Sequence, residues 1–341
     1  MVYNGPFVVA DYQKGSKIVY KKNPKYWNAK SVKLEEADCP IINEQATLVK
    51  MFESGEFDIT GASKDDLARL KKKAESGEVT LVTGKENTVL YDYYNLQNGV
   101  LKNKKVRKAL SMALDRKEML DVVYKRNLPA YGMVGDNVDC SGKVYRKEVP
   151  EPLKPNKEEA RKLMAEGLKD LGVEASSVKI KYLLGPKVTI TSDLSDYMTK
   201  LYKETFGITL ETVFTPDDTT FYDMLDKGEF DIGGSGWGPD YDDVSSYFNV
   251  FLGNGSNNKG HFSSKEYDEL VTKAATEADP AKRIDLYKKA ENILVNEEVA
   301  ASPSFYRDIN SFRKNYVKGS TFNNFGGYYD LSQVYIEGKE K

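Results

Sequence analysis

Two stretches of this sequence resemble each other: EQATLVKMFESGEFDITGAS at residues 44–63 and DDTTFYDMLDKGEFDIGGSG at residues 217–236. Both contain the run GEFDI, at residues 55–59 and again at residues 228–232. In each copy the apolar residues before this run recur on one face of a helix. The glycine that opens the run stands where helices commonly end in a left-handed cap, and the residues after it predict a short strand. The repeat therefore predicts the same helix-to-strand unit twice.

Strand-like segments precede both copies, at residues 32–42 and 208–214. Each copy thus predicts strand, helix and strand, the unit that builds a parallel sheet through a right-handed crossover. A strand at residues 178–184 and a helix at residues 192–206 stand directly before the second copy and predict another such unit. We therefore expect an α/β protein with two related lobes.

Capping side chains predict where other helices begin. They indicate helix starts after Asp115, Asn156, Ser264 and Asp279. Between residues 129 and 155, four of the twelve prolines predict a long loop with short extended pieces. From residue 300 onward the chain is rich in aromatic residues without a helical period, which predicts strands.

Composition narrows the class of protein. The chain has 341 residues, with 50 lysines and arginines against 52 aspartates and glutamates. This length predicts roughly two domains, and a hydrophobic fraction of 40% excludes wholesale disorder. The net charge of −2 gives no general attraction to phosphate backbones, so we expect no nucleic-acid partner. No run approaches the ~18 consecutive apolar residues of a transmembrane helix.

No signature of a catalytic site stands out. The sequence lacks the GxSxG, HExxH, P-loop and GxGxxG motifs, and its one histidine, His261, lies in the polar stretch KGHFSS. The two cysteines, Cys39 and Cys140, form no CxxC motif. We expect them to be reduced thiols, with a long-range disulfide as the alternative. These observations predict a binding protein rather than an enzyme, without a metal or cofactor.

The segment GGSGWGPDYDDVSSYFNVF, residues 233–251, carries the candidate site. Its small residues let another backbone approach closely, with main-chain N–H and C=O groups available for pairing. Trp237 stands at the carboxyl end of a predicted strand, the edge at which α/β sheets bind ligands. Asp240 offers a carboxylate to a cation. The chemistry alone leaves an alternative open, in which Trp237 fills a core and Asp240 caps a turn.

Several segments resemble, in order, those of the oligopeptide/dipeptide-binding receptors of ABC importers, the extracellular solute-binding protein family 5. They are NGPFVVADYQKGSKIVYKKNPKYWN (4–28), SGEFDI (54–59), YDYYNLQNGVLKNKKVRKALSMALDR (91–116), GWGPDYDDVSSYF (236–248), SSKEYDEL (263–270) and FNNFGGYYDLSQVYI (322–336). Some of these blocks are loose individually, but jointly they are specific, and they extend over essentially the whole chain.

The resemblance implies a two-lobed, type II periplasmic-binding-protein-like α/β fold with hinge-crossing strands. Residues 1–95, rejoined by residues 302–341, would form lobe I, and residues 96–301 would form lobe II. The crossing strands would lie at residues 91–95 and 300–306. Members of the family carry a long region, including a signal, before the Gly-Pro-Phe block. We therefore expect this chain to be the C-terminal portion of a longer receptor, with the N-terminal part of lobe I missing.

The resemblance also implies a binding site. Asp240 takes the place of the acid that pairs with the α-ammonium group of a peptide, and Trp237 that of a pocket tryptophan. The strand edge whose main chain pairs with the ligand backbone corresponds to Ser235, Gly236 and Gly238. The remaining expected ligand-binding residues are Tyr241 and, on the crossing strand, Tyr91 and Tyr93. For the crossing-strand tyrosines, sheet packing is the alternative.

The implied function is an extracytoplasmic solute-binding protein that captures peptides in a cleft between the lobes. Its partners would be the peptide and the transmembrane subunits of an ABC permease. We expect a monomer in the periplasm, or held at the outer face of the cell membrane by a lipid anchor outside this chain. Two alternatives stay open: the same fold binding a non-peptide solute, such as an oligosaccharide or chelated nickel, and a non-catalytic protein-docking fragment.

Overall fold

The computed structural model describes residues 2–319 and 330–339. It divides the chain into two compact units. Unit 1 comprises Met1–Lys85 and Asp308–Lys341, and unit 2 comprises Glu86–Arg307.

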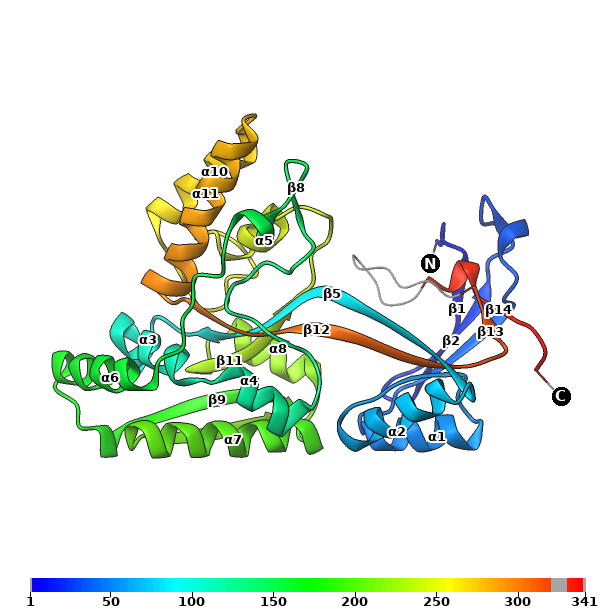
Figure 1. The fold of residues 1–341 in the computed structure, drawn as a ribbon, viewed down its shortest axis with the longest axis horizontal. Helices are drawn as coiled ribbons and strands as arrows, with labels where there is room; N and C mark the ends of the chain where they lie inside the picture. Colours follow the sequence, from blue (N-terminus) through cyan, green and yellow to red (C-terminus); the bar gives the residue numbers. More distant parts are fainter. Residues whose placement is uncertain (1, 320–329, 340–341) are drawn as a thin grey trace. The chain divides into compact units, whose positions relative to one another are not determined.

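Two long strands run from one unit into the other: β5 (Val79–Tyr94) and β12 (Ala301–Lys314) (Figure 1). The lobe boundaries expected from the sequence, after residue 95 and before residue 302, fall at the ends of these strands inside unit 2. The division into functional lobes stays a prediction.

Unit 1 combines a three-stranded antiparallel sheet, in the order β1-β2-β3, with two helices. Its buried core is contributed by α1, α2, β5 and β12 and the turn after β4: Val49, Phe52, Ala62, Leu67, Leu70, Val79 and Phe312. Its remaining elements are β1 (Phe7–Gln13), β2 (Lys17–Lys22), η1 (Ala29–Ser31), β3 (Glu36–Pro40), α1 (Gln45–Ser54), β4 (Ile59–Gly61), α2 (Lys64–Glu75), β13 (Val317–Lys318), η7 (Leu331–Gln333) and β14 (Tyr335–Ile336). Of the segment 322–336, the part up to residue 329 lies outside the described residues.

The first repeat copy is confirmed as a helix followed by a strand. Helix α1 ends at Gly55, whose φ of 89° lies in the left-handed region, and its N–H donates to the carbonyl of Phe52. The expected parallel unit, however, is wrong for this copy. Strand β3 pairs with β2 in a separate sheet, and β4 pairs antiparallel with β12, with Thr60 opposite Phe312. The two strands that flank α1 therefore belong to different sheets.

The second copy forms the predicted parallel units. In unit 2 the sheet order is β10-β9-β11-β5-β12, with β6 beside β12. Strand β9 runs parallel to both β10 and β11, so α7 and α8 are crossover helices, whereas β11 and β5 are antiparallel. Helix α7 packs against β9 and β10, and Figure 1 shows it alongside β9. These elements are β9 (Lys179–Pro186), α7 (Thr189–Phe206), β10 (Thr209–Thr215), α8 (Asp218–Asp226) and β11 (Ile232–Trp237).

The rest of unit 2 consists of helices and short strands that follow the predicted signals. The side chains of Asp115, Asn156, Ser264 and Asp279 accept N–H groups at helix starts, as expected. The elements are η2 (Gly99–Lys102), α3 (Lys104–Ala113), α4 (Arg116–Met119), η3 (Leu120–Tyr124), β6 (Leu128–Pro129), β7 (Asp139–Cys140), β8 (Lys143–Val144), α5 (Tyr145–Glu148), α6 (Lys157–Leu171), η4 (Ala175–Ser177), α9 (Ser245–Phe248), η5 (Asn249–Phe251), α10 (Lys265–Thr276), α11 (Pro280–Asn292) and η6 (Ile293–Glu297).

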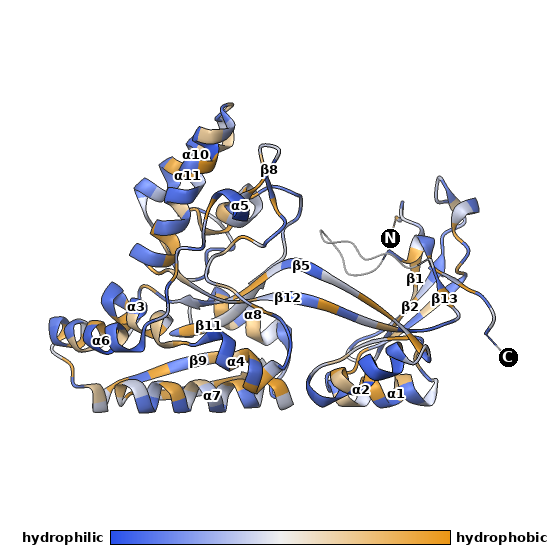
Figure 2. Ribbon diagram, viewed as in Figure 1, coloured by the Kyte–Doolittle hydropathy of each residue, from blue (hydrophilic) through white to orange (hydrophobic). Residues whose placement is uncertain are grey.

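Helix α7 buries one face against the core of unit 2. Figure 2 shows hydrophilic and hydrophobic residues interspersed along α7, whose buried side chains include Met198, Leu201 and Tyr202. Among the helices that the structure describes, none combines the length and the apolar character needed to cross a membrane.

Cys140 is buried and Cys39 is half-buried, and both are free thiols.

Candidate functional site

Strand β11 positions the predicted site beside β5. Its register places Ser235 opposite Tyr91 and Trp237 opposite Val89. Just before the strand, the N–H of Asn95 donates to the carbonyl of Asp231 at 2.8 Å. Because hydrogen-bonded and non-hydrogen-bonded pairs alternate in an antiparallel ladder, the main chains of Ser235 and Trp237 face β5.

The other edge of β11 is open beyond its first residues. Strand β9 pairs with β11 only at Ile232 and Gly233. By the same alternation the main chain of Gly236 points away from β5, toward the side that β9 has left. Within the described chain no strand covers this edge, so the N–H and C=O groups of Gly236 are available for pairing.

This register reduces the number of residues whose main chain could pair with a ligand. The main chain of Ser235 is directed into the sheet, so the expected pairing of its backbone with a ligand does not fit, and Gly236 and Gly238 remain. Packing also explains why both positions are occupied by glycine. A Cβ at Gly236 would lie 2.8 Å from Cδ1 of Leu90, and one at Gly238 would lie 2.8 Å from Oγ1 of Thr88.

Trp237 is half-buried and packs against the hydrophobic core of unit 2. Its indole Nε1 is buried and has no hydrogen-bond partner in the part of the chain that the structure describes. Because the indole N–H has no partner among the described residues, packing and not a polar contact holds the ring in place. Trp237 thus partly fills a core, as the alternative interpretation anticipated, while it adjoins the open strand edge.

Asp240 follows β11 as an exposed residue. Its main-chain N–H donates to Oγ of the buried Ser246 at 3.0 Å. Its carboxylate has no hydrogen bond or ion pair to any residue described in the structure. The carboxylate is therefore free to meet a ligand cation.

The neighbouring acids are engaged in structure. The Oδ1 atom of Asp242 accepts the N–H of Asp139 at 2.9 Å, and Asp243 forms a two-pronged ion pair with Arg283 at 2.8 Å per contact. Tyr241 is exposed, and its hydroxyl lies 3.1 Å from Oγ of Ser245. Of the carboxylates in this turn, Asp240 alone is left without a structural partner among the described residues.

Tyr91 and Tyr93 do not present their hydroxyl groups to a ligand. Their side chains are only 2% and 3% exposed, and their rings pack against Phe251. The Tyr91 hydroxyl donates to that of Tyr93 at 2.8 Å, which in turn donates to the carbonyl of Asn257 at 2.6 Å. Sheet packing, the alternative, accounts for both residues, and we do not keep them as ligand contacts.

Sequence reasoning missed Arg283, the partner of Asp243. The two residues are far apart in the sequence, on α11 and in the turn after β11, and no local pattern joins them. From the sequence, one could note an aspartate in a turn and an arginine on a helix, but not that the two form a pair.

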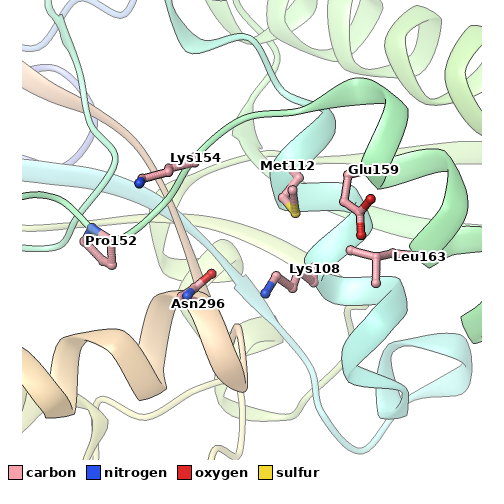
Figure 3. A pocket seen from close by; sticks show the side chains of 7 residues that line it. All are labelled: Lys108, Met112, Pro152, Lys154, Glu159, Leu163 and Asn296. Atoms are coloured by element: carbon pink, nitrogen blue, oxygen red, sulfur yellow. The ribbon is translucent and has the colours of Figure 1, made fainter.

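Two cavities in unit 2 are lined by none of the predicted site residues. One, of about 350 Å³, lies between α3, α6 and η6 and is lined by Lys108, Met112, Pro152, Lys154, Glu159, Leu163 and Asn296 (Figure 3). The other, of about 560 Å³, includes His261 and Lys259. The described residues contain no group of three or more acidic, cysteine or histidine side chains arranged to hold a metal ion.

Comparison with known proteins identifies the family. Residues 1–259 match the model of bacterial extracellular solute-binding proteins, family 5 (middle region). The chain is 30% identical over 323 residues to the periplasmic oligopeptide-binding protein OppA of Escherichia coli, covering 94% of this chain and 58% of that protein. It is 27% identical to the dipeptide-binding protein DppE of Bacillus subtilis, covering 97% and 59%. It is 26% identical to the probable deoxycholate-binding periplasmic protein YgiS of E. coli, covering 99% and 61%.

Solved structures agree with the family and with the expected fold class. The substrate-binding domain of an oligopeptide ABC transporter from Bacillus anthracis matches with a TM-score of 0.90 at 28% identity, covering 98% of this chain and 65% of that chain. The peptide-bound OppA of Listeria monocytogenes matches with a TM-score of 0.88 at 27% identity, with the same coverage. The fold is thus of the type II periplasmic-binding-protein class, as predicted.

The chain spans about 60% of the length of the curated relatives it matches. The matched family and these relatives are solute-binding proteins, a class of non-enzymatic binding proteins. With the family model covering most of the sequence, this chain belongs to family 5 of the bacterial extracellular solute-binding proteins.

Proposed function

We propose that this protein binds peptides with a free N-terminus as the solute-binding component of an ABC importer. The observation that carries the proposal is one juxtaposition in the chain: an open strand edge at Gly236, followed by the exposed carboxylate of Asp240, which has no partner among the described residues.

An extended peptide would add to the open edge of β11. Main-chain hydrogen bonds to Gly236 supply affinity that is independent of the peptide's side chains. Gly238 has no side chain, so it leaves room for the peptide to continue past Trp237. The α-ammonium group then pairs with Asp240, a charge-assisted contact that favours a free N-terminus.

The relatives support this ligand class, because several of them are named oligopeptide- or dipeptide-binding proteins. The proposal includes the transmembrane subunits of an ABC permease as partners and a location outside the cytoplasm. We further propose that the receptor acts as a monomer, either free in the periplasm or tethered by a lipid anchor. It has no catalytic role.

Calorimetric titration with a mixed pool of synthetic tri- to hexapeptides, and with the same pool N-acetylated, tests the proposal. We expect the free pool to bind more tightly. Asp240→Ala weakens its binding about tenfold to a hundredfold, because hydrogen bonds to charged groups contribute about 1.5–3 kcal/mol. Asp196→Ala, which removes an exposed acid on α7, is the matched control and leaves both affinities unchanged. Equal affinity for both pools in the native protein would overturn the proposal.

A second candidate is a non-peptide solute on the same fold. One relative of similar identity is named a probable deoxycholate-binding protein, so members with similar sequences do not all carry peptide names. Titration with deoxycholate separates the candidates: binding that is insensitive to Asp240→Ala, together with no heat from either peptide pool, would favour this one. An oligosaccharide or chelated nickel is tested in the same titration series.

A further inference from the structure

The turn that carries Asp240 is fastened to a distant helix by an ion pair. Arg283 of α11 donates from Nη1 and Nη2 to the two carboxylate oxygens of Asp243, each at 2.8 Å. The two side chains are only 14% and 21% exposed. A two-pronged pair of this kind defines both the distance and the orientation of its partners.

Arg283 is itself held on several sides. Its Nε donates to the carbonyl of Ala274 in α10 at 3.1 Å, and its Nη1 lies 3.3 Å from Oγ of Ser141. The guanidinium also lies over the ring of Tyr287, 5.1 Å from the centroid. Because these contacts come from α10, α11 and the turn between β7 and β8, the guanidinium is a fixed point to which Asp243 is attached.

Hydrogen bonds to two consecutive residues, Ser245 and Ser246, connect Asp243 with Asp240. The Oδ1 atom of Asp243 accepts the N–H of Ser245 at 2.9 Å, and its own N–H donates to the carbonyl of Tyr241 at 2.9 Å. The N–H of Asp240 donates to Oγ of Ser246, the next residue, at 3.0 Å. These bonds close the turn on itself, so the backbone that directs the Asp240 carboxylate depends on the anchored Asp243.

The contacts with Arg283 and Ser245 also determine the charge state of Asp243. Burial acts to raise the pKa of Asp243, but hydrogen bonds from Arg283 and Ser245 outweigh it and hold the pKa below its ordinary value. Asp243 is therefore an ionised carboxylate whose charge is neutralised within the protein. Without Arg283, Asp243 would be an uncompensated negative charge three residues from Asp240 in the chain.

We propose that Arg283, through Asp243 and the Ser246 hydroxyl, is a positioning residue for the ammonium-binding carboxylate of Asp240. This inference rests on the proposed function. Arg283 makes no ligand contact in the proposal; it determines how well the receptor distinguishes a free from a blocked N-terminus.

The measured quantity is the ratio of the Kd for an N-acetylated peptide to the Kd for its free counterpart, using the tightest-binding member of the pool above. We expect Arg283→Met to lower this ratio about tenfold, the equivalent of about one charge-assisted hydrogen bond. The Kd of the acetylated peptide should stay within about twofold. Arg283→Lys keeps the charge but not the two-pronged geometry, so it should recover only part of the ratio.

Ser246→Ala provides a milder variant that removes the hydroxyl contacting Asp240 and keeps the ion pair. We expect it to lower the ratio about threefold. Arg107→Met is the stability control: Arg107 is also buried in unit 2, but it donates to the carbonyls of Leu101 and Glu298. It should lower the melting temperature and leave the ratio unchanged.

The outcomes separate the two proposals. A native ratio near one would overturn the proposed function itself. A large native ratio that both Arg283→Met and Ser246→Ala preserve would overturn the positioning role alone. In an Asp240→Ala background the ratio of the two Kd values should already be near one, and adding Arg283→Met should leave it unchanged. A further change in this ratio would contradict the proposal that Arg283 acts through Asp240.

Discussion

Arg146 and Glu291 form a two-pronged ion pair in the interior of unit 2, with side chains only 7% and 1% exposed. Glu291 also accepts the N–H of Met133 at 2.8 Å. The pair therefore ties the long loop after β6 to helix α11. The same helix carries Arg283, the partner of Asp243 in the turn of the candidate site. The buried pair therefore helps to hold the helix on which this turn depends.

Removal of one charge from this pair should destabilise unit 2. We expect Glu291→Gln to lower the free energy of unfolding by about 3–5 kcal/mol, because it leaves the Arg146 guanidinium buried without a counter-charge. Asp121→Asn breaks the exposed pair between Lys117 and Asp121 and should cost less than about 1 kcal/mol. Urea unfolding of both variants provides the comparison; similar losses for the two would contradict the prediction.

Asp92 should make stability depend on pH. Burial raises its pKa to about 6, against a partial opposing effect of the Tyr182 hydrogen bond and the Arg116 charge. The folded state therefore holds this proton more tightly than the unfolded chain. The contribution of Asp92 to stability should be largest below about pH 4, should fall as the pH rises toward about 6, and should level off above it.

Asp92→Asn removes this penalty while keeping the shape of the side chain. We expect the variant to be more stable than the native protein by roughly 2–3 kcal/mol at pH 8, and to match it near pH 4. The difference in unfolding free energy between the two proteins, measured across this range, isolates Asp92 from other carboxylates. A difference that does not vary with pH would refute the assignment.

Tyr91 and Tyr93 should matter for stability and not for ligand binding. Tyr93→Phe removes the donor to the Asn257 carbonyl and should cost about 0.5–1.5 kcal/mol. Because both rings are buried, the peptide Kd should stay within about twofold of the native value. A tenfold loss of affinity without loss of stability would restore these tyrosines to the site.

The ligand backbone offers a test of strand addition that leaves the protein unchanged. N-methylation of one peptide amide at a time should weaken binding about fivefold to tenfold at alternate positions only, since a strand directs every second N–H toward its neighbour. Calorimetry on the series reads out the pattern. A uniform effect at all positions would speak against pairing with Gly236.

Gly55 should be required for its backbone conformation alone. A Cβ there meets no atom within 4 Å, but the φ of 89° is unfavourable for other residues. We expect Gly55→Ala to destabilise unit 1 by about 1 kcal/mol. Gly5→Ala, with open space and no positive φ, should be neutral and serves as the control in thermal unfolding.

Local signals in the sequence determined the elements of this fold. Asn156 and Asp279 cap helices as predicted, and the second repeat copy forms its parallel units. Such features depend on hydrogen bonds and periodicities within a few residues, so the sequence displays them directly. The order of the family's motifs along the chain determined the family in the same way.

Contacts between distant segments were decided only by the tertiary structure. The first repeat copy carries the same local signals as the second, yet its strand β4 pairs antiparallel with β12. The register of β11 on β5 turned the main chain of Ser235 inward and left that of Gly236 at the open edge.

From the sequence, chemistry and the family resemblance pointed to Asp240 as the cation-binding acid. The tertiary structure gave Asp243 to Arg283 and Asp242 to Asp139, and it left Asp240 without a partner among the described residues. Pairing partners and strand register arise from residues far apart in the chain, whereas a sequence pattern reports only on neighbours. For that reason the sequence could name Asp240, whereas only the folded chain shows that the acids beside it are held in structural contacts.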